Sequence, residues 1–354
     1  MENALQDMKI DYVEFYVEDI DRSLSWLVDG YGFTVRAKAA SASGATRTVN
    51  VGQGGIDLLL TESSEDHPAR AYAAKHGDGI GDLGIRVPDA AAAFAEAVRR
   101  GARPVTEPVT RGATTTATVT GFGDVTHTFV QRPDGSTAAD ARGLRAEPGL
   151  APDPGTGLLA VDHFAACVEP GRLDETVDYY LRTLDFDLTL TERIVTGDQG
   201  MLIKVVQSKS RAVTFTLIEA DTHLAVGQID KFLKDHDGPG VQHMAFSTAD
   251  ILTTVRGLAG RGIELLSTPG AYYSSLAERV QQHRHPVSAL RELNVLVDED
   301  HDGQLFQIFA KSVHPRNTIF LEIIERVGAT SFGSSNIRHL YDSVKAEQEA
   351  GPTS

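Results

Sequence analysis

The chain lacks the residues that build cross-linked or membrane-spanning proteins. Its 354 residues include one cysteine, and no apolar run approaches the roughly 18 residues of a membrane span. Cys167 lies in an apolar strand, so we expect a small buried hydrophobe and not a nucleophile. The polar start MENALQDMKIDYVEF does not have the basic-then-apolar layout of a signal peptide. We therefore expect a cytoplasmic protein with no membrane partner.

Positive charge is also scarce. The sequence has 33 Lys and Arg against 49 Asp and Glu, which gives a formal net charge of −16, and no basic cluster offsets it. Such a chain repels phosphate backbones, so nucleic acid is not an expected partner. The length suggests about two domains. Small molecules are the expected ligands.

The two halves of the chain resemble each other. Three segments of the first half have a counterpart in the second: residues 11–33 and 161–186, 77–102 and 238–263, and 127–132 and 321–326. The stretch between the halves is rich in Pro, Gly, Ala and charge and has no apolar periodicity, which is typical of a linker. We expect domains at residues 8–140 and 155–345, joined by a linker at 141–154.

Each half is expected to hold two βαβββ units, in which a helix is followed by hairpins such as MLIKVVQ/SKSR/AVTFTLIE. The predicted fold class is α+β, with tandem βαβββ modules that form two cup-like half-barrel domains. A hairpin closed by SKSR would set Ile203 opposite Thr216.

Three ligand-type residues lie in separate β-type segments of the second half. His163, His243 and Glu322 occur in VDHFAACV, GVQHMAFST and TIFLEIIERV, where apolar alternation would let each side chain point into one cavity. Two imidazoles and one carboxylate on one face of iron(II) leave positions open for substrate and dioxygen, as in non-haem oxygenases. This pattern indicates a metal-dependent oxygenase.

The internal repeat allows each of these three residues to be compared with its counterpart in the first half. Its equivalent positions hold Tyr12, Asp82 and Thr128, so only the second half is expected to bind metal. A single histidine on a strand is more often a structural residue than a ligand. Three ligand-type residues at equivalent repeat positions favour the metal site.

Five motifs carry a family resemblance: DHFA with His163, GPGVQHMAF with His243, QLFQIF with Gln307 and Phe309, FLEIIER with Glu322, and FGSSNIRHLYDSV near the C-terminus. Over nearly its whole length, the chain resembles the 4-hydroxyphenylpyruvate dioxygenase and 4-hydroxymandelate synthase family, within the vicinal oxygen chelate fold. The resemblance implies Fe(II) at the two histidines and the glutamate.

The same resemblance implies a reaction and its partners. An aromatic 2-oxo acid would chelate the iron through its keto oxygen and carboxylate, and O2 would drive oxidative decarboxylation and then hydroxylation of the arylacetate. No organic cofactor is needed. Family members are often dimers or tetramers, so a homodimer or homotetramer is expected.

The resemblance also implies residues around the metal. They comprise three glutamines, three phenylalanines and two residues of a C-terminal helix that covers the mouth of the site: Gln228, Gln242, Gln307, Phe309, Phe320, Phe332, Ile337 and Tyr341. Gln307 is expected on the strand face of Phe309, across from the segment of Glu322. Gln242 directly precedes His243, so strand alternation puts its side chain on the opposite face of the strand. A structural hydrogen bond is therefore as good an interpretation of Gln242 as a role at the metal. The phenylalanines could instead belong to the core.

The residues expected around the aryl group of the substrate indicate which product forms. Ring-hydroxylating members carry a Pro-x-Asn pair where this chain has Thr216 and Ile218, in TFTLIEAD, and this difference favours benzylic hydroxylation to 4-hydroxymandelate. Both branches usually carry a serine where this chain has Ile203, which leaves Thr216 and Tyr341 as candidate contacts for a phenol. The alternatives are homogentisate formation and an oxygenase for phenylpyruvate or another 2-oxo acid.

Two other functional classes fit the sequence less well. A glyoxalase-like isomerase would need a fourth metal ligand, which the sequence does not offer at an equivalent position, and a metal-free binding protein would not retain all three ligands. Other histidines lie in polar stretches and are expected to be solvent-exposed: His283, His285 and His301.

Overall fold

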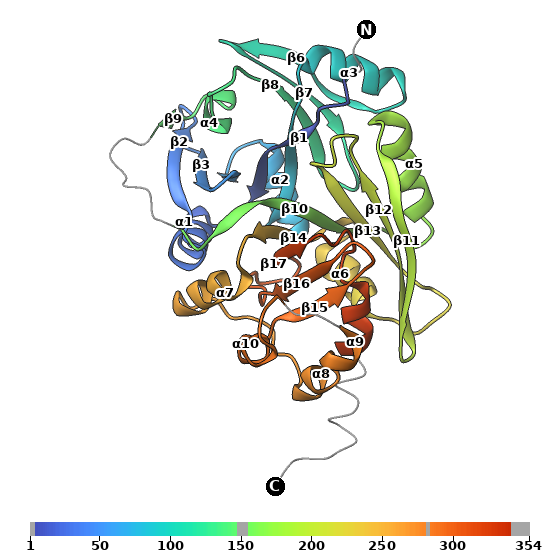
Figure 1. Cartoon of the computed structure of the whole chain (residues 1–354). Helices are drawn as coiled ribbons and strands as arrows, with labels where there is room; N and C mark the ends of the chain where they lie inside the picture. Colours follow the sequence, from blue (N-terminus) through green and yellow to red (C-terminus); the bar gives the residue numbers. More distant parts are fainter. Residues whose placement is uncertain (1–3, 147–154, 281–283, 341–354) are drawn as a thin grey trace.

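A computed structural model of the chain describes residues 4–146, 155–280 and 284–340. Each half is built around one curled mixed sheet, and in Figure 1 the blue-to-teal strands of the N-terminal half lie above the orange-to-red strands β15, β16 and β17 of the C-terminal half. The predicted α+β class with tandem βαβββ modules is confirmed. In the described part of the chain, no helix has the length and apolar character to cross a membrane.

The N-terminal half contains two βαβββ units that share a nine-stranded sheet in the order β6-β7-β8-β5-β1-β4-β3-β2-β9. The first unit comprises β1 (Lys9–Tyr16), α1 (Ile20–Ser25), the π-helical turn η1 (Trp26–Gly30), β2 (Thr34–Ala40), β3 (Thr46–Gln53) and β4 (Ile56–Ser63). After α2 (Pro68–His76), the second comprises β5 (Gly79–Arg86), α3 (Ala90–Arg99), β6 (Pro104–Arg111), β7 (Thr114–Thr120) and β8 (Thr126–Gln131). The half ends with α4 (Ala138–Ala141) and β9 (Arg145–Ala146).

The C-terminal half repeats this plan in an eight-stranded sheet, in the order β11-β12-β13-β10-β14-β17-β16-β15. Its first unit comprises β10 (Leu158–Cys167), α5 (Leu173–Thr183), β11 (Asp187–Thr196), β12 (Gln199–Gln207) and β13 (Thr214–Ala220), followed by α6 (Gln228–His236). Its second comprises β14 (Gly240–Thr248), α7 (Ile251–Gly260), α8 (Gly270–Ser274), α9 (Leu276–Arg279), α10 (Val287–Glu292), β15 (Leu296–Glu299), β16 (Gln304–Phe309) and β17 (Phe320–Val327). Residues 334–340 are helical.

Local sequence explains where the long helices begin and which face they bury. The carboxylates of Asp89 and Asp250 accept hydrogen bonds from backbone N–H groups in the first turns of α3 and α7. Helix α3 then buries Ala90, Ala93 and Ala97 at helical spacing against the sheet. Helices α3 and α7 therefore pack on the face of each sheet opposite to Tyr12 and Ala165, and leave the concave face for a site.

The strand register supports the repeat seen in the sequence. β1 and β5 pair antiparallel at the centre of the first sheet, with Glu14 opposite Asp82. β10 and β14 pair in the same way at the centre of the second sheet, with Ala165 opposite His243. Asp82 and His243 therefore occupy equivalent places, as the alignment of the two halves predicted.

One predicted register is wrong. Ile203 lies opposite Ile218, not opposite Thr216, because the turn between β12 and β13 includes Ala212 and Val213 in addition to SKSR. The shift is two residues along β13, so the strand alternation still puts these side chains on one face of the sheet.

The two halves pack through buried rings. His127 of β8 lies in the core, where its Nδ1 donates to the carbonyl of Thr126 at 2.9 Å and its Nε2 accepts from the Tyr180 hydroxyl at 2.7 Å. Its ring stacks on Phe215 with 5.6 Å between centroids. Burial lowers the pKa of His127 to about 4, so the ring is neutral in the folded protein at neutral pH.

This buried histidine predicts an acid-sensitive stability. An unfolded histidine titrates near pH 6.5, whereas His127 titrates near 4 when folded, so its stabilising effect is complete above about pH 6.5 and is lost as the pH falls towards 4. We expect a loss of about 3 kcal/mol in the free energy of unfolding across this range. His127→Gln should flatten that pH dependence in denaturant titrations. An unchanged slope would contradict this role.

Candidate metal centre

Three side chains converge from three neighbouring strands. His163 on β10, His243 on β14 and Glu322 on β17 each offer a ligand atom, and these atoms lie within 4.8 Å of one another. The Nε2 atoms of the two histidines lie 3.4 Å and 3.3 Å from Oε2 of Glu322. The ring centroids of the histidines are 5.7 Å apart. The structure thus brings together all three residues singled out in the sequence.

The residue before each histidine fixes the direction of its ring. A carboxylate oxygen of Asp162 accepts from Nδ1 of His163 at 2.8 Å. The amide oxygen of Gln242 lies 3.4 Å from Nδ1 of His243, although strand alternation predicted the opposite face for Gln242. With a proton on each Nδ1, both Nε2 lone pairs point at the space beside Glu322. Both Nε2 atoms must face the same point if the two histidines are to bind one metal ion.

Asp162 is itself held by an arginine from the last strand. The Nε and Nη2 atoms of Arg326 each donate to Asp162 at 2.9 Å, and Nη1 donates to the carbonyls of Ala329 and Ser331. The guanidinium also lies 4.9 Å from the centre of the Phe332 ring. One side chain therefore connects the orientation of His163 to the segment that follows β17.

The charges in the site are strongly coupled. Burial opposes ionisation of Glu322, but His163 and His243 lower its pKa to about 2. Burial would likewise lower the pKa of His163, but Asp162 and Glu322 raise it to about 9. The pKa of His243 is lowered by burial. The buried carboxylate thus requires a positive charge beside it, which a proton on His163 supplies when no cation is bound.

The donor set fits a divalent transition metal. Two imidazole nitrogens and one carboxylate on one side of an ion form the facial arrangement that leaves other positions free. The amide oxygen of Gln307 is buried and has no hydrogen-bond partner in the described chain, so the site keeps a polar atom available. A Cβ on Gly333 would lie 2.0 Å from that oxygen, so only glycine permits this close approach.

Aromatic rings enclose the two histidines. Phe320 stacks on His243 with 5.0 Å between centroids, and Phe309 meets the same ring edge-on at 5.8 Å. Phe332 meets His163 edge-on at 5.2 Å. All three phenylalanines named from the sequence therefore lie at the metal centre.

An apolar wall continues from these rings along the inside of the cup. The wall comprises buried side chains of β10 to β13 and α6, with two residues from beyond β17 packed against it: Ala165, Cys167, Ile194, Met201, Ile203, Val205, Ile218, Ala220, Ile229, Phe232, Phe332 and Ile337. Burial raises the pKa of the Cys167 thiol, which agrees with its expected role as a small hydrophobe. Thr216 is also buried, and its hydroxyl has no partner among the described residues.

Two further groups at the site were not predicted from the sequence: the Asp162–Arg326 ion pair and Glu192. Arg326 and Asp162 could have been found, because the repeat aligns them with Arg132 and Asp11, which form the same ion pair at 2.8 Å. Glu192 could not have been found from the sequence, because its place beside the apolar wall depends on which residue it faces on the neighbouring strand.

Glu192 lies opposite Ile203 in the β11–β12 ladder, on the side of the sheet that carries the apolar wall. Its Oε2 atom is buried and has no hydrogen-bond partner in the described chain. A buried carboxylate oxygen without a donor is costly unless a ligand or water supplies one.

Some predicted residues are placed elsewhere or lie beyond the described ranges. Gln228 is exposed at the start of α6, and Tyr341 falls outside the described residues, as does His283. His301 is exposed, as expected, but the expectation of an exposed His285 is wrong. His285 is buried, and its Nε2 lies 2.9 Å from the carboxylate of Glu325 on β17, which also accepts from the backbone N–H of Ile251 at the start of α7.

The chain is similar to known proteins along its whole length. Profiles described as "Hydroxyphenylpyruvate dioxygenase, HPPD, N-terminal" and "Glyoxalase/Bleomycin resistance protein/Dioxygenase superfamily" match residues 1–141 and 160–308. The 4-hydroxyphenylpyruvate dioxygenase of Tetrahymena thermophila is 30% identical over 371 residues, which cover 96% of this chain and 90% of that protein. The enzyme of the same name from Yarrowia lipolytica is 29% identical, with 96% and 91% covered.

A solved structure is similar as well. A triple mutant of 4-hydroxymandelate synthase from Streptomyces coelicolor matches with a TM-score of 0.85 and 38% identity, which covers 97% of this chain and 99% of that one. The chain therefore belongs to the 4-hydroxyphenylpyruvate dioxygenase and 4-hydroxymandelate synthase family of dioxygenases, within the vicinal oxygen chelate superfamily.

Proposed function

We propose that the protein is an iron(II) dioxygenase that converts 4-hydroxyphenylpyruvate and O2 to 4-hydroxymandelate and CO2. The convergence of His163, His243 and Glu322 carries the oxygenase part of this proposal. The apolar pair Ile203 and Ile218 on the inner face of the cup supports the benzylic product. The reaction balances, since one atom of O2 enters the new carboxylate and the other the benzylic hydroxyl.

Iron(II), when bound, supplies the activation of O2 and the site at which the 2-oxo acid chelates. His163, His243 and Glu322 would hold it from one side only. Asp162 and Gln242 keep the proton of each histidine on Nδ1, so that both rings remain ligands. The apolar wall excludes water from the reacting carbon.

The inner face of the cup would orient the aryl group. Ile218 offers no polar anchor where ring-hydroxylating relatives carry an asparagine, so the ring can move until its benzylic carbon lies nearest the metal. Glu192 is the candidate acceptor for the para-hydroxyl, because its buried oxygen lacks a donor and it lies across the ladder from Ile203. A substrate phenol would supply the missing hydrogen bond.

The alternative is homogentisate formation, since the curated relatives named above are 4-hydroxyphenylpyruvate dioxygenases. The decisive experiment supplies iron-loaded protein with 4-hydroxyphenylpyruvate and identifies the product by chromatography and mass. We expect 4-hydroxymandelate from the natural sequence. Ile218→Asn should shift a substantial fraction to homogentisate, while Ile218→Leu should not. Homogentisate as the main product of the unaltered enzyme would refute the proposal.

A second prediction concerns the carboxylate beside His163. Asp162→Asn removes the charge that orients the ring, and we expect iron affinity to fall at least about 10-fold in metal titrations. Asp11→Asn is the matched control, because Asp11 makes the same ion pair with Arg132 but has no histidine beside it. An equal loss of iron affinity in both variants would show that the effect is only structural.

A third prediction concerns recognition of the phenol. Glu192→Leu should lower kcat/KM for 4-hydroxyphenylpyruvate about 10- to 100-fold, because the hydroxyl loses its acceptor inside an apolar wall. The value for phenylpyruvate should change by less than about 3-fold. Glu192→Gln keeps an acceptor oxygen and should lose less. Equal losses for the two substrates would rule out a contact between Glu192 and the para-hydroxyl.

A further inference from the structure

The N-terminal cup has a different centre at the place equivalent to the metal site. There, the Tyr12 hydroxyl donates to one carboxylate oxygen of Asp82 at 2.9 Å, and the Thr128 hydroxyl donates to the other at 3.0 Å. These are the three residues that correspond to the C-terminal ligand set. Their polar atoms bind one another, which leaves them no free donor set for an ion.

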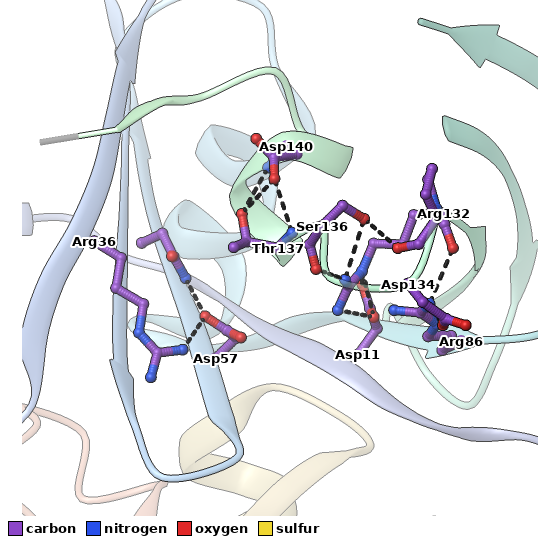
Figure 2. Close-up of polar contacts among 11 residues, drawn as sticks. Asp11, Arg36, Asp57, Arg86, Arg132, Asp134, Ser136, Thr137 and Asp140 are labelled. Carbon is purple, nitrogen blue, oxygen red and sulfur yellow. Dashed lines mark hydrogen bonds and ion pairs between the residues drawn. The ribbon is translucent and has the colours of Figure 1, made fainter. Parts of the chain in front are cut away.

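The segment after β8 brings an arginine to this centre. Figure 2 shows how the segment is fastened: Arg132 pairs with Asp11 and donates to the backbone oxygen of Ser136, and Thr137 and Asp140 cap α4 reciprocally. Helix α4, with Arg142 at its C-terminal end, is therefore held against the sheet face that carries Tyr12. The segment corresponds to the one after β17, which carries Phe332 to His163.

Arg142, at the end of α4, supplies a positive charge to this centre. Its Nη2 donates to Glu14 at 2.6 Å and its Nη1 lies 3.4 Å from the Tyr12 hydroxyl. The Glu14 side chain is fully buried, but 31% of the Arg142 side chain is exposed. Within the described chain nothing accepts from Nε. The guanidinium therefore retains donors that face open space.

That space is a cavity of about 510 Å³ between α2, β5 and the β6–β8 strands. Threonine hydroxyls line one side of it, and two tyrosine rings, Tyr16 and Tyr72, meet edge-on at 5.6 Å on another. Both rings are largely buried. The cavity thus combines an arginine, hydroxyls and an aromatic surface.

Each acidic group near the cavity already has a donor within the protein. Burial and the charge of Glu14 together raise the pKa of Asp82 to about 6, and its carboxylate accepts hydrogen bonds from the hydroxyls of Tyr12, Thr126 and Thr128. Glu14 is neutralised by Arg142 and accepts from the Thr61 hydroxyl at 2.6 Å. At the mouth, Lys75 and Asp124 pair at 2.7 Å. Arg142 therefore keeps N–H donors that the acidic groups of the cavity do not occupy.

We propose that this cavity of the N-terminal cup binds a small aromatic carboxylate, with the carboxylate on Arg142 and the ring beside Tyr16 and Tyr72. Arg142 holds its ligand as a guanidinium holds carboxylates elsewhere, through charge-assisted hydrogen bonds. The proposal does not depend on which product the C-terminal site forms.

The test uses metal-free full-length protein and 4-fluorophenylacetate, with binding followed by fluorine NMR. Arg142→Gln should weaken binding at least about 10-fold, because a charge-assisted pair is lost. Arg145→Gln is the matched control, since Arg145 is exposed on β9 and does not line the cavity. It should bind as the unaltered protein does.

A second variant guards against a folding defect in Arg142→Gln. Thr106 lines the cavity from the exposed strand β6, so Thr106→Trp should narrow the opening and weaken binding while the Arg142–Glu14 pair stays intact. Unchanged binding in both variants would place the probe elsewhere and overturn the proposal. Failure of the unaltered protein to bind the probe more tightly than about 10 mM would overturn it as well.

Discussion

An aspartate–arginine ion pair that links the first strand of each half to the C-terminal end of its last long strand, β8 or β17, is the interaction on which both cups depend. Asp162 and Arg326 form it in one half, and Asp11 and Arg132 form it in the other. In each case the arginine also binds the backbone of the segment that follows the last strand. The pair therefore sets where the chain goes after the sheet ends, and hence what covers the cup.

The two halves place different chemistry on this shared frame. In the C-terminal cup, the aspartate of the pair adjoins a histidine, and the covering segment brings an aromatic ring. In the N-terminal cup, the corresponding position holds Tyr12 and the covering segment brings Arg142. A buried carboxylate needs a positive partner in either case. One half meets that need with a site suited to a metal ion, and the other with a guanidinium that belongs to the chain.

Sequence alone predicted the fold class and the residues of the triad, because strand alternation and the internal repeat are local patterns. It could not set the β12–β13 register, since the length of a turn depends on how its residues pack. That error placed Ile203 opposite the wrong residue. Glu192 was missed for the same reason: nothing around it in the sequence is unusual, and its meaning comes from its neighbour across the ladder. His285 was misjudged because its partner, Glu325, lies 40 residues away.

The three candidate ligands come from β10, β14 and β17, which are adjacent in space but widely separated along the chain. No short peptide of this protein can gather them, so capture of the ion must follow completion of the sheet. Loading of a metal ion would then be a late maturation step, carried out by an already folded protein.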